Sequence, residues 1–110
     1  MEHLYGKFSE KQIEKLRKSI RGSIFFLLVS VDPNTKDEHE DVDVEVNFDY
    51  IINRLNRLNK LLIDRVELVD IMSMLHSARL EYQKPDFDFK VYRKLILDAG
   101  AEVERLKEGE

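Results

Sequence analysis

The stretch IRGSIFFLLVSV, residues 20–31, decides the fold. Seven of its last eight residues are apolar, so it could be a membrane segment, a central β-strand or a buried helix. The apolar run from Ile24 to Val31 covers about eight residues, whereas a membrane-spanning helix needs about 20. Charged residues, Arg21 and Asp32, border the run on both sides. We therefore exclude a membrane segment.

Apolar residues upstream of this run share one helical phase with it. They recur at spacings of 3, 4, 4, 3 and 4, at Ile13, Leu16, Ile20, Ile24, Leu27 and Val31. This is the period of an α-helix rather than of a strand. Ser9 and Gln12 have the spacing of a capping box, which marks a helix start. The sequence predicts one helix over residues 10–31, ended by Asp32-Pro33.

The second half of this helix is apolar almost all round, because Phe25, Phe26, Leu28 and Val29 widen its apolar surface. A helix of this kind is expected to be buried all round. Either the other helices of the chain cover it, or Phe25, Phe26 and Val29 contact a second copy of the chain. Gly22 costs about 1 kcal/mol relative to Ala inside a helix, and we interpret it as the site of a close helix crossing.

Three further helices follow from apolar positions at helical spacing and from possible aspartate caps. We predict them over residues 43–62, 65–82 and 89–107, after an acidic loop over residues 32–42. Asp43, with Asp49 as an alternative, caps the first of them, and Asp64 and Asp88 cap the others. No Gly or Pro separates the second helix from the third, so one continuous kinked helix is the rival interpretation.

The predicted fold class is all-α, as one four-helix bundle over residues 1–110 with up-down-up-down antiparallel topology. A chain of 110 residues has the size of one domain. Four Gly and two Pro are too few for a many-stranded β fold. The chain has no Cys, and its N-terminus has no apolar stretch after a basic start, so it lacks the features of a signal peptide. We predict a cytoplasmic protein.

Charge is distributed unevenly along the chain, whose net charge is −4. Residues 1–22 carry six basic and three acidic side chains, whereas residues 32–49 carry one basic and eight acidic ones. We predict that an acidic segment contacts a protein partner with a basic surface, through Asp37, Glu38, Glu40, Asp41, Asp43 and Glu45. A basic row on the first helix could contact an anion or nucleic acid, through Lys11, Lys15, Lys18 and Arg21.

No catalytic, cofactor-binding or metal-binding residues are predicted. His76 lies near Ser73 and Ser77, but no nucleophile elbow or orienting carboxylate accompanies it. The sequence HEDVD at 39–43 lacks the second His of a zinc-protease motif. The four Gly residues are isolated from one another, which excludes phosphate-binding loops. We therefore predict a protein that is not an enzyme and has no cofactor.

The leading functional hypothesis is a small interaction module that binds another protein as a regulator, inhibitor or immunity-type factor. A homodimer through Phe25, Phe26 and Val29 is compatible with it. One alternative is a nucleic-acid-associated regulator that uses the basic row, although the acidic balance of the domain argues against nucleic acid. Another is an enzyme or small-ligand binder with an aromatic pocket between helices, formed by Phe25, Phe26, Phe48, Tyr50, Phe87, Phe89 and Tyr92.

Overall fold

Four long α-helices account for most of the chain in the computed structural model, which describes residues 2–3, 6–7, 9–39, 41–61 and 66–106. They are α1 (Glu10–Val29), α2 (Val44–Leu61), α3 (Val66–Tyr82) and α4 (Phe89–Val103). A two-residue strand β1 (Glu2–His3) pairs antiparallel with β2 (Gly6–Lys7), and a 3₁₀ turn, η1 (Lys36–His39), precedes α2. The predicted all-α class with four helices is confirmed.

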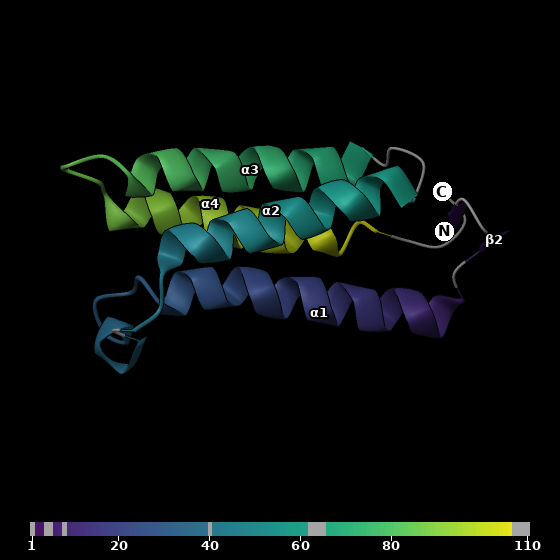
Figure 1. The fold of residues 1–110 in the computed structure, drawn as a ribbon, viewed down its shortest axis with the longest axis horizontal. Coiled ribbons are helices and arrows are strands. Elements are labelled where there is room, and N and C mark those ends of the chain that lie inside the picture. The colour runs from purple at the N-terminus through teal and green to yellow at the C-terminus, as the bar shows by residue number, and fades with distance from the viewer. Residues whose placement is uncertain (1, 4–5, 8, 40, 62–65, 107–110) are drawn as a thin grey trace.

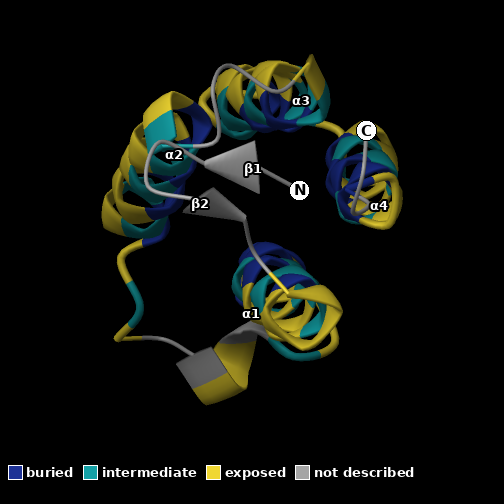
Figure 2. Cartoon of the chain, turned by 90° about the vertical axis from the view of Figure 1, so that its right-hand side faces the viewer, coloured by how far each residue is buried: buried dark blue, intermediate teal, exposed yellow. Residues whose placement is uncertain are grey.

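The helices lie side by side along the long axis of the molecule, whose extents are 45 × 22 × 20 Å (Figure 1). Figure 2 looks along this axis and shows the helices in the order α1, α2, α3, α4 around a shared interior, with their buried, dark blue parts on the side that faces it. α3 packs on both α2 and α4, whereas α1 packs on α4 and more loosely on α2.

Side-chain caps start the helices where the sequence places them. The Ser9 hydroxyl accepts the Gln12 backbone N–H at 3.1 Å, and the Gln12 side chain accepts the Ser9 N–H at 2.8 Å, so the capping box is confirmed. Carboxylate oxygens of Asp43 and Asp88 accept first-turn N–H groups of α2 and α4 at 3.2 and 2.8 Å. The predicted cap Asp64 lies outside the described residues.

Apolar side chains from all four helices line the interior. The buried members on the first two helices are Ile13, Ile20, Ile24, Leu27, Phe48, Ile51 and Leu55, and those on the last two are Leu68, Ile71, Leu75, Ala78, Tyr92, Ile96, Ala99 and Val103. Leu16, Leu58, Met72, Tyr82, Phe89 and Leu95 pack against them and are partly buried. Each helix thus turns one apolar face to the interior.

Helix α1 differs from its prediction in two respects. It ends at Val29 rather than at residue 31, because Ser30 caps it and its hydroxyl donates to the Phe26 carbonyl at 2.8 Å. It is also not buried all round, since Phe25 is 56% exposed and Phe26 is 36% exposed. The other three helices therefore do not cover the whole apolar surface of α1, so the first of the two alternatives is wrong, and contact with a second copy stays a prediction.

Helix α4 ends at Val103, earlier than the predicted residue 107, which lies outside the described residues. Backbone N–H groups of Glu104, Arg105 and Leu106 each bond the carbonyl three residues before. This tighter spacing is typical of a 3₁₀ turn at a helix end. The turn still places Leu106 in the core, where it is fully buried.

The predicted close helix crossing at Gly22 is wrong. A Cβ atom added at Gly22 would meet no heavy atom of another residue within 4 Å, and the same holds for Gly100 on α4. The kinked-helix interpretation of residues 43–82 is also wrong, because α2 ends at Leu61 and α3 begins at Val66 as a separate helix (Figure 1). The predicted loop 32–42 contains the turn η1.

Candidate interaction surface

The outer face of α1 carries residues of two kinds. Its members recur at spacings of 4, 3, 4, 3 and 4, at Lys11, Lys15, Lys18, Gly22, Phe25 and Val29. This spacing keeps them on one side of the helix, opposite the buried side that carries Ile13, Ile20 and Ile24. Every member is exposed except Val29, which is half-buried. The outer face is therefore basic in its first half and apolar in its second.

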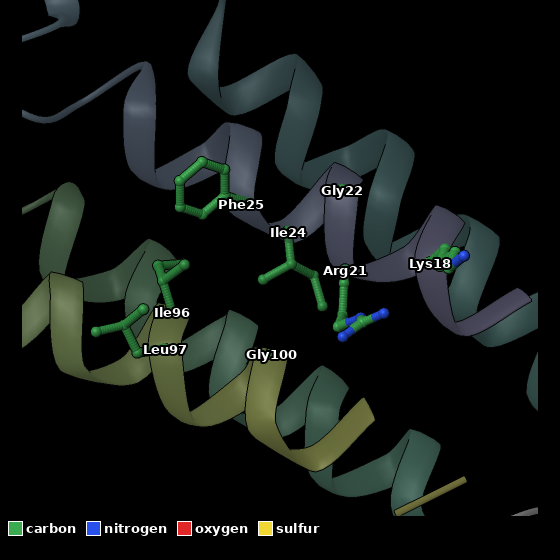
Figure 3. Close-up of a pocket in the computed structure, with 8 residues that line it drawn as sticks. All are labelled: Lys18, Arg21, Gly22, Ile24, Phe25, Ile96, Leu97 and Gly100. Carbon is green, nitrogen blue, oxygen red and sulfur yellow. The ribbon is translucent and has the colours of Figure 1, made fainter. Parts of the chain in front are cut away.

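A groove of about 420 Å³ runs between α1 and α4 beside this face (Figure 3). Ile24 and Ile96 extend into the space between the two helices, and Phe25 and Leu97 border it. Leu97 is 41% exposed, so both helices present apolar side chains at the surface. Gly22 on α1 and Gly100 on α4 also line the groove. Because neither residue has a side chain, the groove stays open at these two positions.

Basic side chains border the same groove. Lys18 and Arg21 line it from α1, and Arg21 forms an ion pair with Glu104 just beyond the end of α4. Arg17 on the preceding turn donates to the Leu106 carbonyl and forms an ion pair of 2.6 Å with Glu14. The Arg17 guanidinium also lowers the pKa of the Glu14 carboxyl. The N-terminal half of α1 is thus attached to the C-terminal end of α4 by arginines.

A second groove, of about 430 Å³, lies on the other side of α1, where α1 packs loosely on α2. Phe26 and Gly22 line it from α1, and Tyr50 and Ile51 line it from α2. Tyr50 is 59% exposed. Gly22 lies on both grooves. The apolar half of the outer face is therefore bordered by a groove on each side.

The acidic segment lies at the end of the bundle where α1 stops and α2 starts. Its side chains at Asp37, Glu38, Asp41 and Asp43 are exposed, and η1 projects outside the bundle next to α1 (Figures 1 and 2). Glu40 lies outside the described residues. The segment is therefore close to the apolar half of the outer face.

Glu45 is half-buried and paired within the bundle, unlike the exposed carboxylates of the acidic segment. It lies in the first turn of α2, where its carboxylate accepts the Arg79 guanidinium of α3 at 2.7 Å and the Gln83 amide at 3.1 Å. Arg79 also binds Asp49 at 2.7 Å. The hydrogen bond that Arg79 donates to the Asp49 carboxylate is the main cause that raises the Arg79 pKa, and Glu45 contributes. Glu45 and Asp49 therefore join α2 to α3.

The four residues of the predicted basic row differ in exposure and in ion pairing. Lys11, Lys15 and Lys18 are exposed, whereas Arg21 is half-buried and paired with Glu104. In the part of the chain that the structure describes, none of the three lysines forms an ion pair within 4 Å. Three of the four predicted residues are therefore available to an anionic surface.

The aromatic residues separate into two groups instead of lining one pocket. Tyr92 is buried and contacts Phe48 and Phe87 edge-on, with ring centroids 6.3 Å apart in both pairs, and its hydroxyl donates to the Leu27 carbonyl at 2.6 Å. Burial, with a smaller contribution from Tyr82, raises the Tyr92 pKa. The second group, Phe25, Phe26 and Tyr50, borders the two grooves of α1. The first group is part of the core.

Among the described residues, the remaining polar side chains form no cluster of metal ligands. His76 is exposed on α3, and no group of three or more His, Asp or Glu side chains among the described residues is placed to hold a metal ion. Sequence reasoning missed two buried carboxylates, Glu81 and Glu102. Each has a basic residue three positions later, Lys84 or Arg105, within ion-pair distance at 3.4 and 3.5 Å. That spacing was a signal present in the sequence.

Comparison of the chain with protein-family models, with curated proteins and with solved structures finds no match. Within the residues that the structure describes, each helix is too short or too polar to cross a membrane.

Proposed function

We propose that this chain is a small cytoplasmic module without enzymatic activity, which binds another protein as a regulator, inhibitor or immunity-type factor. The observation that carries the proposal is the apolar half of the α1 outer face, where Phe25 is exposed between two grooves and next to an acidic segment. Contiguous exposed apolar surface on a small domain is typical of an interaction site.

The two features have different roles in binding. Large side chains that border a groove, such as Phe25 and Leu97, can be enclosed by a partner, and residues of this kind dominate binding free energy. The exposed carboxylates of Asp37, Glu38 and Asp41 attract a basic surface from a distance, which increases the association rate. The partner is therefore a protein with a basic surface that carries an apolar side chain.

The proposed scaffold is an up-down-up-down antiparallel bundle. In Figure 1 the chain runs to the left along α1, returns along α2, runs to the left along α3 and returns along α4. α3 ends at Tyr82 and α4 begins at Phe89, and a connection this short favours antiparallel neighbours. This topology places the acidic segment beside the apolar half of α1, because both lie at the same end of the bundle.

Capture from a native lysate, followed by mass spectrometry, tests the proposal. The wild-type chain is compared with Phe25→Asp, which removes the apolar anchor, and with the pair Asp37→Lys and Glu38→Lys, which reverses the acidic segment. The control is Asp86→Lys, an exposed site in the α3–α4 connection. We expect a protein with a basic surface that wild type and the control retain and that both test variants lose. Equal capture by all four chains would contradict the proposal.

A nucleic-acid-associated regulator is the second candidate, and the exposed Lys11, Lys15 and Lys18 favour it. Each phosphate contacted by a lysine contributes about −0.9 to the slope of log K against log salt on duplex DNA. A fluorescence-anisotropy titration with duplex DNA at several salt concentrations tests it. A slope near −3 that is lost in Lys11→Glu, Lys15→Glu, Lys18→Glu would support this candidate, and the absence of binding at low salt would reject it.

A further inference from the structure

We propose that the protein partner is a second copy of this chain, bound through the outer face of α1 with the two α1 helices antiparallel about a two-fold axis near Phe25. The inference rests on the proposed function, because it assigns a partner to the same surface. A two-fold axis requires a surface that complements itself when its direction is reversed. The outer face of α1 meets this requirement in both its apolar and its charged residues.

The apolar residues are complementary about this axis. When α1 pairs antiparallel about Phe25, the two Phe25 side chains meet at the centre, and Gly22 of each copy faces the region of Val29 of the other. Gly22 has open space where a Cβ atom would be, so it leaves room for the larger side chain opposite. Both grooves of α1 reach this point, because Gly22 lines each of them. Exposed apolar side chains of each copy therefore lie opposite the open space at Gly22 of the other copy.

The charged residues are complementary about the same axis. Lys18 lies seven residues before Phe25, about 10 Å along the helix at 1.5 Å per residue, and Asp32 lies seven residues after Phe25 in the sequence, just past the end of α1. Beyond Lys18, Lys15 and Lys11 continue the basic half, and beyond Asp32 the turn η1 carries Asp37 and Glu38 outside the bundle. Antiparallel pairing brings the lysines of each copy opposite the carboxylates of the other.

Parallel pairing of the same faces would have the opposite effect. It would set the lysines of one copy against those of the other and the carboxylates against the carboxylates, and like charges across an interface oppose association. The charge distribution along α1 therefore selects one orientation. The basic surface expected of a partner is then the basic half of α1 itself, which explains why one chain carries both charges at the two ends of one helix.

The outer face of α1 alone is smaller than a standard interface. Helix α1 has 20 residues, so it is about 30 Å long and about 10 Å wide, whereas a standard interface takes about 800 Å² from each partner. The dimer therefore also needs contacts at the groove borders on α2 and α4 and at η1. We expect reversible association with a dissociation constant in the micromolar range.

Sedimentation equilibrium across micromolar concentrations tests the inference by a charge swap. One variant reverses the basic half (Lys11→Glu, Lys15→Glu) and another reverses the acidic segment (Asp37→Lys, Glu38→Lys). Each alone should raise the dissociation constant of its own pair at least about tenfold, because like charges then face each other at both ends. Mixing the two should restore a heterodimer, and combining all four substitutions in one chain should restore a homodimer.

The matched control is Arg57→Glu, Lys60→Glu, which changes net charge by the same amount at exposed sites of α2. It should dimerise like wild type. A second test, Phe25→Asp, should abolish the dimer, and circular dichroism of the same sample verifies that the bundle remains folded. The pairing would be overturned if the chain with all four substitutions stays monomeric, or if the control dimerises as weakly as the reversed variants.

Failure of this inference is distinguishable from failure of the proposed function. A wild-type chain that remains monomeric at all concentrations overturns self-pairing. If such a chain still captures a basic protein, and the Asp37→Lys, Glu38→Lys variant loses it, the proposed function stands with a different partner. If the chain neither self-associates nor captures a protein, both are rejected.

Discussion

Substitution of Tyr92 by Phe isolates one buried hydrogen bond that joins α4 to α1. The Tyr92 hydroxyl donates to the Leu27 carbonyl at 2.6 Å. Leu27 lies in the last turn of α1, whose carbonyls have no following helical N–H groups, and the Val31 N–H bonds Leu28 instead. The remaining contact of this carbonyl, with the Ser30 hydroxyl, is long at 3.5 Å. Tyr92→Phe therefore leaves a buried acceptor poorly satisfied.

The expected loss in the free energy of unfolding follows from this geometry. A lost intramolecular hydrogen bond costs about 1 kcal/mol, and a buried acceptor without a good partner adds to that cost, so we expect about 1.5–2.5 kcal/mol in total. The phenyl ring keeps its contacts with Phe48 and Phe89, so no cavity forms. For a chain of this size the melting temperature should fall by roughly 6–10 °C.

Urea denaturation followed by circular dichroism measures this loss. The denaturation midpoint should fall while the m-value stays constant, since the folded state exposes no new surface. The matched control is Tyr50→Phe, where the hydroxyl belongs to a side chain that is 59% exposed, and its effect should stay within about 0.5 kcal/mol. Equal stability of the Tyr92→Phe and Tyr50→Phe variants would refute the reasoning.

The same residue gives the pH dependence a definite sign. Burial raises the Tyr92 pKa above its ordinary value. The stabilisation that its burial gives to the folded state is therefore fully present below about pH 10, where Tyr92 is protonated in both the folded and the unfolded chain. It is lost above that pH, as Tyr92 ionises in the unfolded chain. Above pH 10, the free energy of unfolding of wild type should fall by about 1.4 kcal/mol per pH unit relative to that of Tyr92→Phe. The difference in stability between the two chains should therefore disappear about one to two units above pH 10.

Three other substitutions have expected outcomes that thermal or urea denaturation can measure. Ser9→Ala removes the capping box of α1 and should cost about 1 kcal/mol; an unchanged midpoint would contradict the role of the cap. Arg79→Gln removes the ion pairs with Glu45 and Asp49 and should cost about 0.5–1 kcal/mol at low salt, less at 1 M NaCl because these side chains are partly exposed. Gly100→Ala should stabilise the bundle by about 0.5–1 kcal/mol, since its Cβ meets no other residue; destabilisation would mean that the site is crowded.

The sequence predicted the helices well because their signals are local. The capping box at Ser9 and the apolar spacing from Ile13 to Leu27 depend on residues within a few turns of one another, and the structure confirms both. The end of α1 was misplaced by two residues, because Ser30 caps the helix and its hydroxyl bonds the Phe26 carbonyl, which also accepts the Ser30 backbone N–H. Such a side-chain bond depends on a rotamer, which periodicity does not determine.

The surface was harder to predict, because it depends on how the helices pack. Periodicity places Phe25 and Phe26 on an apolar helix but does not reveal that α2 and α4 leave them exposed. The pairing of Glu45 with Arg79 joins residues 34 positions apart in the sequence, so the sequence placed Glu45 in the second helix but did not reveal its ion pair with the third. Gly22 was assigned to a close crossing for the same reason, since one helix alone does not show what faces it.

Gly22 links the stability of the bundle to its proposed pairing. A glycine inside a helix costs about 1 kcal/mol, and no close neighbour within 4 Å of its missing Cβ explains that cost here. If the hollow at Gly22 receives a side chain of a second copy, Gly22→Gln should have two opposite effects. It should raise the unfolding free energy of the isolated bundle by about 0.5 kcal/mol, because glutamine favours helix, and it should weaken the dimer by filling the hollow with a polar group. Denaturation at low concentration and sedimentation at high concentration separate the two effects, and a variant that is more stable but dimerises as tightly as wild type would show that the hollow at Gly22 is not part of the interface.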